Sequence, residues 1–141
     1  NHLTFSYNVK PKQALYFVNI ENDDIQIWTQ GQGRYTSNWF PSFDDVNEKV
    51  IFNLGITYKK EYQVVSNGVL KSKTEKDNLV HWQYQMENPM SSYLLVLSVG
   101  KYDRKDFLSK SKIPLEYYNE NKDASRFDNT YRYSKRIFDF L

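Results

Sequence analysis

The sequence predicts an all-β protein, a β-sandwich with one helix at its C-terminus. Several short segments alternate apolar and polar residues, which is the period of a half-buried strand. Turn-forming residues separate these segments at regular intervals, as is typical of sandwiches. Helical spacing appears only near the end of the chain. A packed core is available because the 141 residues include 3 Trp, 12 Tyr and 9 Phe.

Four strands are expected in the first part of the chain. Residues 3–9 alternate apolar and polar side chains and predict the first strand. Short apolar runs at residues 15–20 and 25–29 predict the next two. Residues 50–58 keep strict alternation, which is the clearest strand signal of the sequence. Because the chain starts inside a strand pattern without a Met, we expect the domain to be incomplete at its start.

A hairpin is expected where Asn67-Gly68 separates two further strand patterns, residues 62–66 and 69–73. Asn and Gly both tolerate positive φ, so this dipeptide predicts a type I′ turn. The two strands would then pair with each other in one sheet.

Three more strands are expected after this hairpin. Residues 76–78 predict a turn, and residues 80–86 alternate again. The nearly continuous apolar run at residues 93–99 predicts a strand buried on both faces. A polar and basic stretch at residues 101–112 then leads to the last predicted strand, residues 113–118.

The end of the chain is expected to be helical and to lead into another domain. Apolar residues after position 126 recur at helical spacing, and Asp123 or Ser125 is suited to cap that helix. We therefore expect a sandwich domain over residues 1–122. Residues 123–141 would form the helix that enters a catalytic domain absent from this chain.

Composition and charge exclude several classes of protein. The net charge of +2 is less basic than expected of a nucleic-acid binder. No run of 18 apolar residues occurs, so no transmembrane segment is expected. The absence of Cys excludes a thiolate metal site and a Cys nucleophile. The cellular compartment stays open.

No catalytic or metal-binding residue is identified from motifs. The sequence has no His-Glu-x-x-His motif, no Gly-x-Ser-x-Gly motif and no phosphate-binding loop, and His2 and His81 lie far apart along the chain. The basic residues between positions 101 and 112 could bind an anion, but Asp103 and Asp106 lie among them, which favours a solvated face. Asp44-Asp45 is interpreted as a capped turn, because Asp side chains bond backbone N–H groups two residues on.

The stretch from Trp28 to Lys49 is the candidate functional region. Gln30 and Gln32 flank Gly31, whose missing side chain allows the backbone to approach a ligand closely. Each amide offers donors and an acceptor. From the residues alone, a binding loop and a plain turn are equally open. The three Trp residues could also form a surface on which sugars stack, although core positions are more typical of aromatic residues.

The same stretch closely resembles the aminopeptidase N-type zinc metallopeptidases. Their N-terminal β-domain carries T-Q-x-E/Q, followed by F-P-x-F-D-E-P-x-x-K. Residues 29–32 match the first part, and residues 40–45 with Lys49 match the second part at a suitable distance. Ser37, Ser42, Asp45 and Val46 stand where family members often have Arg, Cys, Glu and Pro, and these differences concern turn contacts.

The resemblance implies a fold, an activity and three substrate-binding residues. The fold would be a saddle-shaped β-sandwich packed on a thermolysin-like catalytic domain, which would hold zinc and the general base outside this chain. The activity would be removal of N-terminal residues from peptide substrates. Gln32 would hold the free α-amine of the substrate. Gln30 would line the pocket for the first side chain, with Gly31 between them.

Two other functions stay open at this point. One is a non-catalytic β-sandwich that binds carbohydrate or protein. The other is a catalytically dead homologue that serves as a scaffold. The sequence does not indicate the preferred substrate residue or the oligomeric state.

Overall fold

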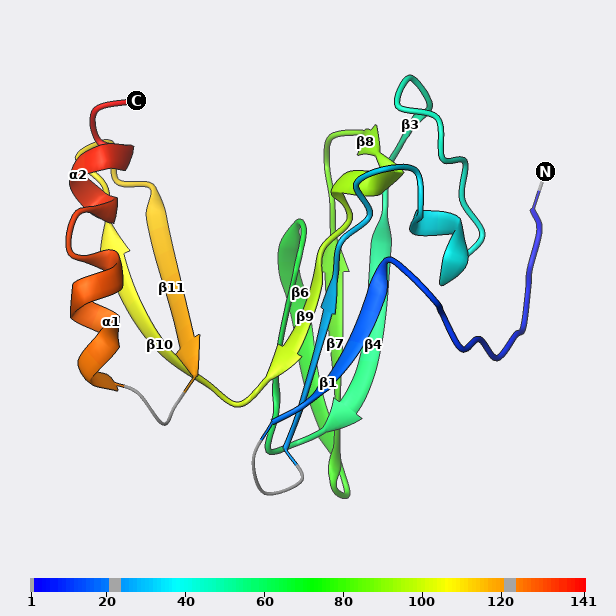
Figure 1. Cartoon of the computed structure of the whole chain (residues 1–141), viewed down its shortest axis with the longest axis horizontal. Helices are drawn as coiled ribbons and strands as arrows, with labels where there is room; N and C mark the ends of the chain where they lie inside the picture. The colour runs from blue at the N-terminus through cyan, green and yellow to red at the C-terminus, as the bar shows by residue number, and fades with distance from the viewer. Residues whose placement is uncertain (1, 21–23, 121–123) are drawn as a thin grey trace. The chain divides into compact units, whose positions relative to one another are not determined.

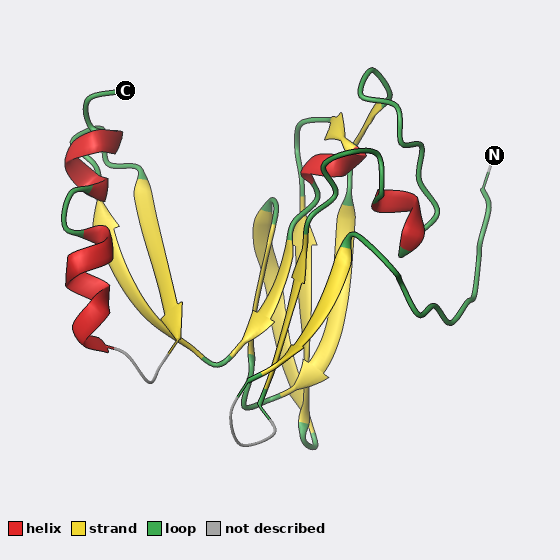
Figure 2. Cartoon of the chain, viewed as in Figure 1, coloured by secondary structure: helices red, strands yellow, loops and turns green. Residues whose placement is uncertain are grey.

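A computed structural model describes residues 2–20, 24–120 and 124–141, except the side chains of 124 and 125 (Figures 1 and 2). Its contacts divide the chain into two compact units, Asn1–Val99 and Gly100–Leu141. Most of the regular structure is strand, which confirms the all-β fold class. The expected boundary between residues 122 and 123 stays a prediction.

The first unit contains a four-stranded sheet in the order β1-β2-β9-β5. Its members are β1 (Leu15–Asn19), β2 (Ile25–Thr29), β9 (Leu97–Gly100) and β5 (Gln63–Ser66). β2 pairs antiparallel with β1 on one side and with β9 on the other. The end of β2 therefore lies next to the chain segment that leads into β9.

A second sheet in the same unit has three strands in the order β4-β7-β6. Its members are β4 (Asn53–Lys59), β7 (Leu79–Gln85) and β6 (Val69–Lys76). Both pairings are antiparallel, and a bulge interrupts β6 between Leu70 and Ser72. A short separate pair joins β3 (Lys49–Val50) to β8 (Met90–Ser91).

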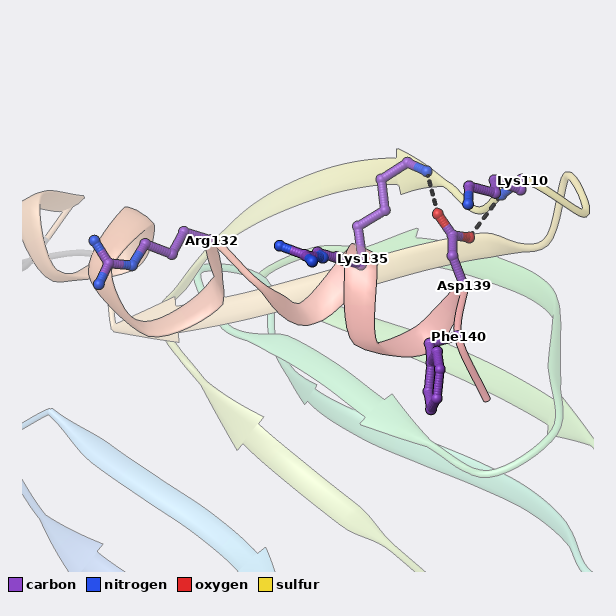
Figure 3. Close-up of a pocket in the computed structure, with 6 residues that line it drawn as sticks. Lys110, Arg132, Lys135, Asp139 and Phe140 are labelled. Carbon is purple, nitrogen blue, oxygen red and sulfur yellow. Dashed lines mark hydrogen bonds and ion pairs between the residues drawn. The ribbon is translucent and has the colours of Figure 1, made fainter.

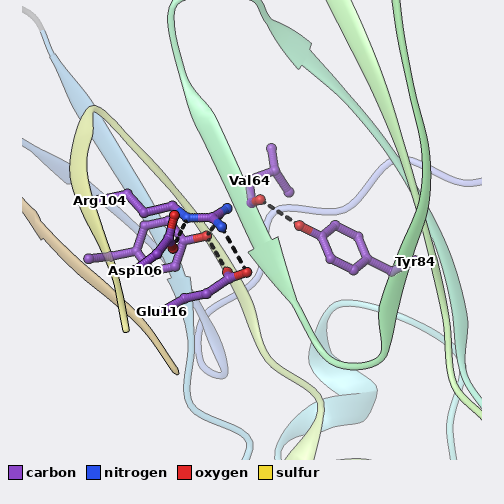
Figure 4. A network of polar contacts seen from close by, with 6 residues as sticks. Val64, Tyr84, Arg104, Asp106 and Glu116 are labelled. Carbon is purple, nitrogen blue, oxygen red and sulfur yellow. Dashed lines mark hydrogen bonds and ion pairs between the residues drawn. The ribbon is translucent and has the colours of Figure 1, made fainter. Parts of the chain in front are cut away.

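The two sheets share one hydrophobic core, which makes the unit a sandwich. Alternate residues of β7 point into this core, and Trp82 is only 2% exposed. The four-stranded sheet supplies Ile27, Val64 and Val99 to the same cluster. The hydroxyl of Tyr84 on β7 donates a 2.7 Å hydrogen bond to the carbonyl oxygen of Val64 on β5 (Figure 4). This bond links the two sheets inside the core.

The second unit is a hairpin followed by two short helices. β10 (Tyr102–Leu108) pairs antiparallel with β11 (Pro114–Glu120), and α1 (Ala124–Tyr131) and α2 (Ser134–Phe138) follow. Phe127 is buried, and the ring of Tyr131 stacks on that of Tyr117 at 5.0 Å. The expected C-terminal helix is therefore two helices. Of its two expected caps, Asp123 and the side chain of Ser125 lie outside the described part.

A polar network covers one face of this hairpin (Figure 4). Arg104 contacts Asp106 at 2.6 Å and Glu116 at 3.0 Å. The hydroxyl of Tyr118 donates a 2.7 Å hydrogen bond to Glu116. Partial burial, together with this hydrogen bond, raises the pKa of Tyr118 to about 12. Arg104 is thus paired within its own hairpin, as expected of a solvated face.

The prediction of a strand at residues 3–9 is wrong. The segment has no regular structure, and Leu3 and Phe5 are 82% and 63% exposed. Alternation can form a strand only where a neighbouring strand completes the hydrogen bonds. Within the described residues, no strand pairs with this segment.

The predicted hairpin at Asn67-Gly68 is also wrong. The strands on either side exist, but β5 belongs to the four-stranded sheet and β6 to the three-stranded sheet. Only Gly68 has a positive φ, +88°, so the turn is not type I′. The side chains of Ser66 and Asn67 bond the backbone of Val96, which keeps the end of β5 beside the approach to β9.

The buried strand expected at residues 93–99 is only half correct. Its first part is a 3₁₀ turn, Ser92–Leu94, and β9 begins at Leu97. Leu94 and Val96 are exposed, so the run is not buried on both faces. The polar stretch at 101–112, for which no strand was expected, contains β10. The strands expected near residues 15–20, 25–29, 80–86 and 113–118 are confirmed, and the 50–58 pattern is present as β3 and β4.

Candidate functional site

The candidate loop leaves the four-stranded sheet at the end of β2. The amide of Gln30 donates to the carbonyl of Ala14 at 2.8 Å, which extends the pairing of β1 and β2 by one step. The hydroxyl of Thr29 donates to the carbonyl of Leu95 at 3.1 Å and accepts from the amide of Leu97 at 2.9 Å. One side chain thus fixes the start of the loop to the entry of β9.

Gly31 is buried where the loop passes over another segment. A Cβ atom at this position would lie 2.6 Å from the hydroxyl oxygen of Thr36 and 2.8 Å from the carbonyl oxygen of Tyr93. Only glycine fits this position without a shift of its neighbours. The close approach at Gly31 in the structure is to the protein itself, and the expected approach to a ligand stays a prediction.

Gln30 and Gln32 are both exposed beside this buried glycine. Within the described residues, the structure records no hydrogen-bond partner for either side-chain amide. Each amide therefore keeps an acceptor oxygen and two N–H donors for a ligand. The backbone between the two side chains is fixed, although the side chains themselves project from the surface.

The second half of the motif is a turn held by its two carboxylates. Asp44 accepts hydrogen bonds from the amide of Ser37 at 3.1 Å and from the hydroxyl of the same residue. Asp45 accepts from the amide of Asn47 at 2.9 Å, two residues on, as the capped-turn interpretation predicts. Both carboxylates are engaged in the turn.

Both halves of the motif rest on residues 90–95, which we call the support segment. The hydroxyl of Ser92 donates to the carbonyl of Phe43 at 2.7 Å, and that of Ser91 donates to the carbonyl of Val46 at 2.5 Å. Sequence reasoning did not identify these serines or Thr36. No local signal marks Ser91 and Ser92, since their partners lie 45 and 49 residues away, and the buried hydroxyl of Thr36 has no hydrogen-bond partner among the described residues.

Comparison with known proteins places this motif in a family. The family described as Peptidase M1 N-terminal domain matches residues 2–94, which include the loop, the turn and most of the support segment. The chain belongs to this family. The resemblance found in the sequence is therefore confirmed as an N-terminal domain of an M1 aminopeptidase.

Curated relatives of this M1 domain are much longer than the chain. Glutamyl aminopeptidase of Homo sapiens is 30% identical over 103 residues, which are 72% of this chain and 11% of the relative. The enzyme of that name from Bos taurus is 29% identical over 105 residues, with the same coverage. Leucyl aminopeptidase of Saccharolobus solfataricus is 28% identical over 92 residues, which are 65% of this chain and 12% of the relative.

The Trp residues of the M1 domain lie in three different environments. Trp82 is in the sandwich core, and Trp39 is half-buried beside Phe40. Trp28 lies at the surface, where its ring stacks on Tyr16 at 4.6 Å. The core interpretation is correct for Trp82 and wrong for Trp28.

The described residues of the M1 domain do not form a metal site. No three His, Cys, Asp or Glu side chains come together in the part of the chain that the structure describes. His81 shares a 2.9 Å hydrogen bond with the hydroxyl of Thr57 on the neighbouring strand.

No helix among the described residues is long and apolar enough to cross a bilayer.

A basic cavity of about 480 Å³ lies in the second unit (Figure 3). Its lining is formed by Lys110, Arg132, Lys135, Arg136, Asp139 and Phe140. The carboxylate of Asp139 accepts a 2.7 Å bond from Lys135 and another from the amide of Lys110. These two bonds lower the pKa of Asp139. The carboxylate thus joins α2 to the tip of the β10–β11 hairpin.

Proposed function

We propose that this chain is the substrate-anchoring part of an aminopeptidase that removes N-terminal residues from peptides. Membership of the M1 N-terminal domain family supports a role in an aminopeptidase. The observation that carries the finer proposal is the exposed amide of Gln32, which has no hydrogen-bond partner in the described part of the chain, next to the closely packed backbone of Gly31. The chemical step would take place in a thermolysin-like catalytic domain outside this chain.

Gln32 would bind the free α-ammonium group of the peptide. An ammonium group has only donors, so it needs acceptor oxygens, and the amide oxygen of Gln32 is one. A neutral amide binds a cation less strongly than a carboxylate does. We therefore expect acidic residues of the catalytic domain to supply the negative charge. Gln30, on the other side of Gly31, would line the pocket for the first side chain.

Zinc belongs to the proposal only through the parent protein. The described residues do not fit a zinc site, because no cluster of ligating side chains is present among them. In a zinc peptidase the metal polarises the scissile carbonyl and activates water. None of that chemistry is assigned to this chain, whose proposed task is to bind and orient the amino end of the substrate.

Kinetics of the full-length protein test this proposal. The substrates are aminoacyl p-nitroanilides, and the variants are Gln32→Ala and, as a matched control, Gln13→Ala, which changes another exposed Gln of the same unit. A hydrogen bond to a charged group contributes about 1.5–3 kcal/mol, so kcat/KM should fall about 10- to 150-fold for Gln32→Ala alone. Unchanged kinetics would remove Gln32 from the site.

The same assay separates the proposed activity from a catalytically dead homologue. Hydrolysis by the wild-type protein that stops when the α-amine of the substrate is acetylated supports an aminopeptidase. A folded full-length protein that hydrolyses none of a broad panel of aminoacyl substrates would favour the scaffold.

A further inference from the structure

We infer that Thr29 and the support segment (residues 90–95) are positioning elements that set where Gln32 presents its amide to the substrate. This inference rests on the proposed function, since it concerns the same loop. In this role the residues would act through the loop and not by contact with the substrate.

Buried polar residues gather at this place. Ser91 and Ser92 are only 5% and 4% exposed, and both hydroxyls are hydrogen-bonded, whereas the hydroxyl of Thr36, which is 1% exposed, has no hydrogen-bond partner among the described residues. A buried hydroxyl is costly unless it is hydrogen-bonded, so such residues usually serve a defined contact. Ser91 and Ser92 each donate to a carbonyl of the turn at residues 43–46. The support segment is therefore hydrogen-bonded to the second half of the motif.

Thr29 joins the first half of the motif to the end of the same segment. Its hydroxyl accepts from the amide of Leu97 and donates to the carbonyl of Leu95, so both of its hydrogen-bonding directions are used. Leu95 and Leu97 lie 66 and 68 residues away from Thr29 in sequence. Gln32 follows Thr29 by three residues, so the position of Gln32 depends on this anchor.

Gly31 brings the loop into direct contact with the support segment. The Cβ position of Gly31 lies within 3 Å of both the carbonyl oxygen and the Cα atom of Tyr93. A displacement of Tyr93 would therefore move the backbone next to Gln32. Because a misplacement of about 1 Å can cost about 10²-fold in rate, such contacts matter for substrate binding.

A double-mutant cycle in the full-length protein tests whether Thr29 acts through Gln32. Thr29→Val keeps the shape of the side chain and removes both hydrogen bonds, whereas Thr29→Ser keeps the hydroxyl. The other variants are Gln32→Ala and the double variant Thr29→Val/Gln32→Ala. Thr74→Val, an exposed Thr of β6, is the matched control. KM and kcat are measured separately with alanine p-nitroanilide, alongside the thermal unfolding midpoint.

We expect Thr29→Val to raise KM about tenfold with a smaller change in kcat, because the ammonium anchor is displaced. Thr29→Ser and Thr74→Val should stay close to wild type. The double variant should be no worse than Gln32→Ala, since two residues that act as a unit are not additive. If Thr29→Val does not fold, Ser92→Ala takes its place in the same cycle.

Two results would overturn the inference, and they are distinguishable from each other. If Gln32→Ala weakens binding but Thr29→Val is silent, or if their effects simply add, the support segment has no positioning role while the proposed function stands. If Gln32→Ala itself is silent, the proposed function fails, and the inference fails with it.

Discussion

Replacement of Gly31 by alanine is the most direct test of the packing under the candidate loop. The added methyl group would lie 2.6 Å from the hydroxyl oxygen of Thr36, 2.8 Å from the carbonyl oxygen of Tyr93 and 2.9 Å from its Cα atom. Two of these three atoms belong to backbone, which cannot rotate away as a side chain can. Overpacking of this kind typically costs about 1–3 kcal/mol.

We expect the upper half of this range for Gly31→Ala, because a segment bonded on both sides must shift. The free energy of unfolding is measured by urea titration with Trp fluorescence. Gly55→Ala is the control, since the atoms nearest to its methyl group would belong to the side chains of His81 and Gln83, at 3.0 and 3.2 Å. Both side chains can move, so the control should change stability by less than about 0.5 kcal/mol.

The double variant Gly31→Ala/Thr36→Ala separates the two contacts. It removes the hydroxyl oxygen of Thr36 and leaves the clash with Tyr93. The free energy of unfolding should therefore be only partly restored relative to Gly31→Ala. A Gly31→Ala protein as stable as the Gly55→Ala control would refute the close packing of Gly31 against Thr36 and Tyr93, which holds the backbone of the loop in place.

Three further predictions concern ionisation and the core. The pKa of Asp139 is lowered in the folded state, so the ionised carboxylate stabilises the fold above the ordinary aspartate pKa, and this stabilisation is lost as the pH falls through the lowered value. The Asp139→Asn variant should therefore be less stable than wild type at neutral pH and nearly as stable as wild type in acid. Urea unfolding at each pH measures this difference. The pKa of Tyr118 is raised to about 12, so a spectrophotometric titration should include a tyrosine that ionises near pH 12. Glu116→Gln should move that ionisation toward the ordinary tyrosine value, and an unchanged titration would contradict the contact. Trp82→Ala should cost about 3–5 kcal/mol in unfolding free energy, because it leaves a cavity between the two sheets, and a loss below about 1 kcal/mol would place Trp82 outside the core.

Sequence reasoning was most successful where a local pattern is enough to determine the structure. The alternation of Val80, Trp82 and Tyr84 identifies both the strand and its inward face, and all three are buried. The same reasoning fails at residues 3–9, which alternate equally well. Alternation describes one strand, whereas a strand exists only with a neighbour, and the local sequence does not say which neighbour is present.

Turn chemistry also has a limited reach. Asn67-Gly68 does mark a turn between two strands, but the dipeptide does not determine whether these strands pair with each other. The side chain of Asn67 accepts a hydrogen bond from the amide of Val96, a contact across 29 residues that no local pattern reveals. The candidate loop was found through its glycine, its amides and a family resemblance. Ser91 and Ser92 beneath it were missed because their partners are equally remote.

The order of strands in the four-stranded sheet has a consequence for how the loop is assembled. β1 and β2 adjoin in sequence, as do β6 and β7, so these pairs form through short chain closures. β9 instead lies between β2 and β5 in the sheet, although all three strands of the other sheet separate β2 from β9 in the sequence. The partners of Thr29 arrive only with the approach to β9. The loop that carries Gln32 therefore depends on long-range contacts that the β1–β2 and β6–β7 pairs do not need, and slower formation of those contacts would delay the proposed binding surface more than it delays these pairs.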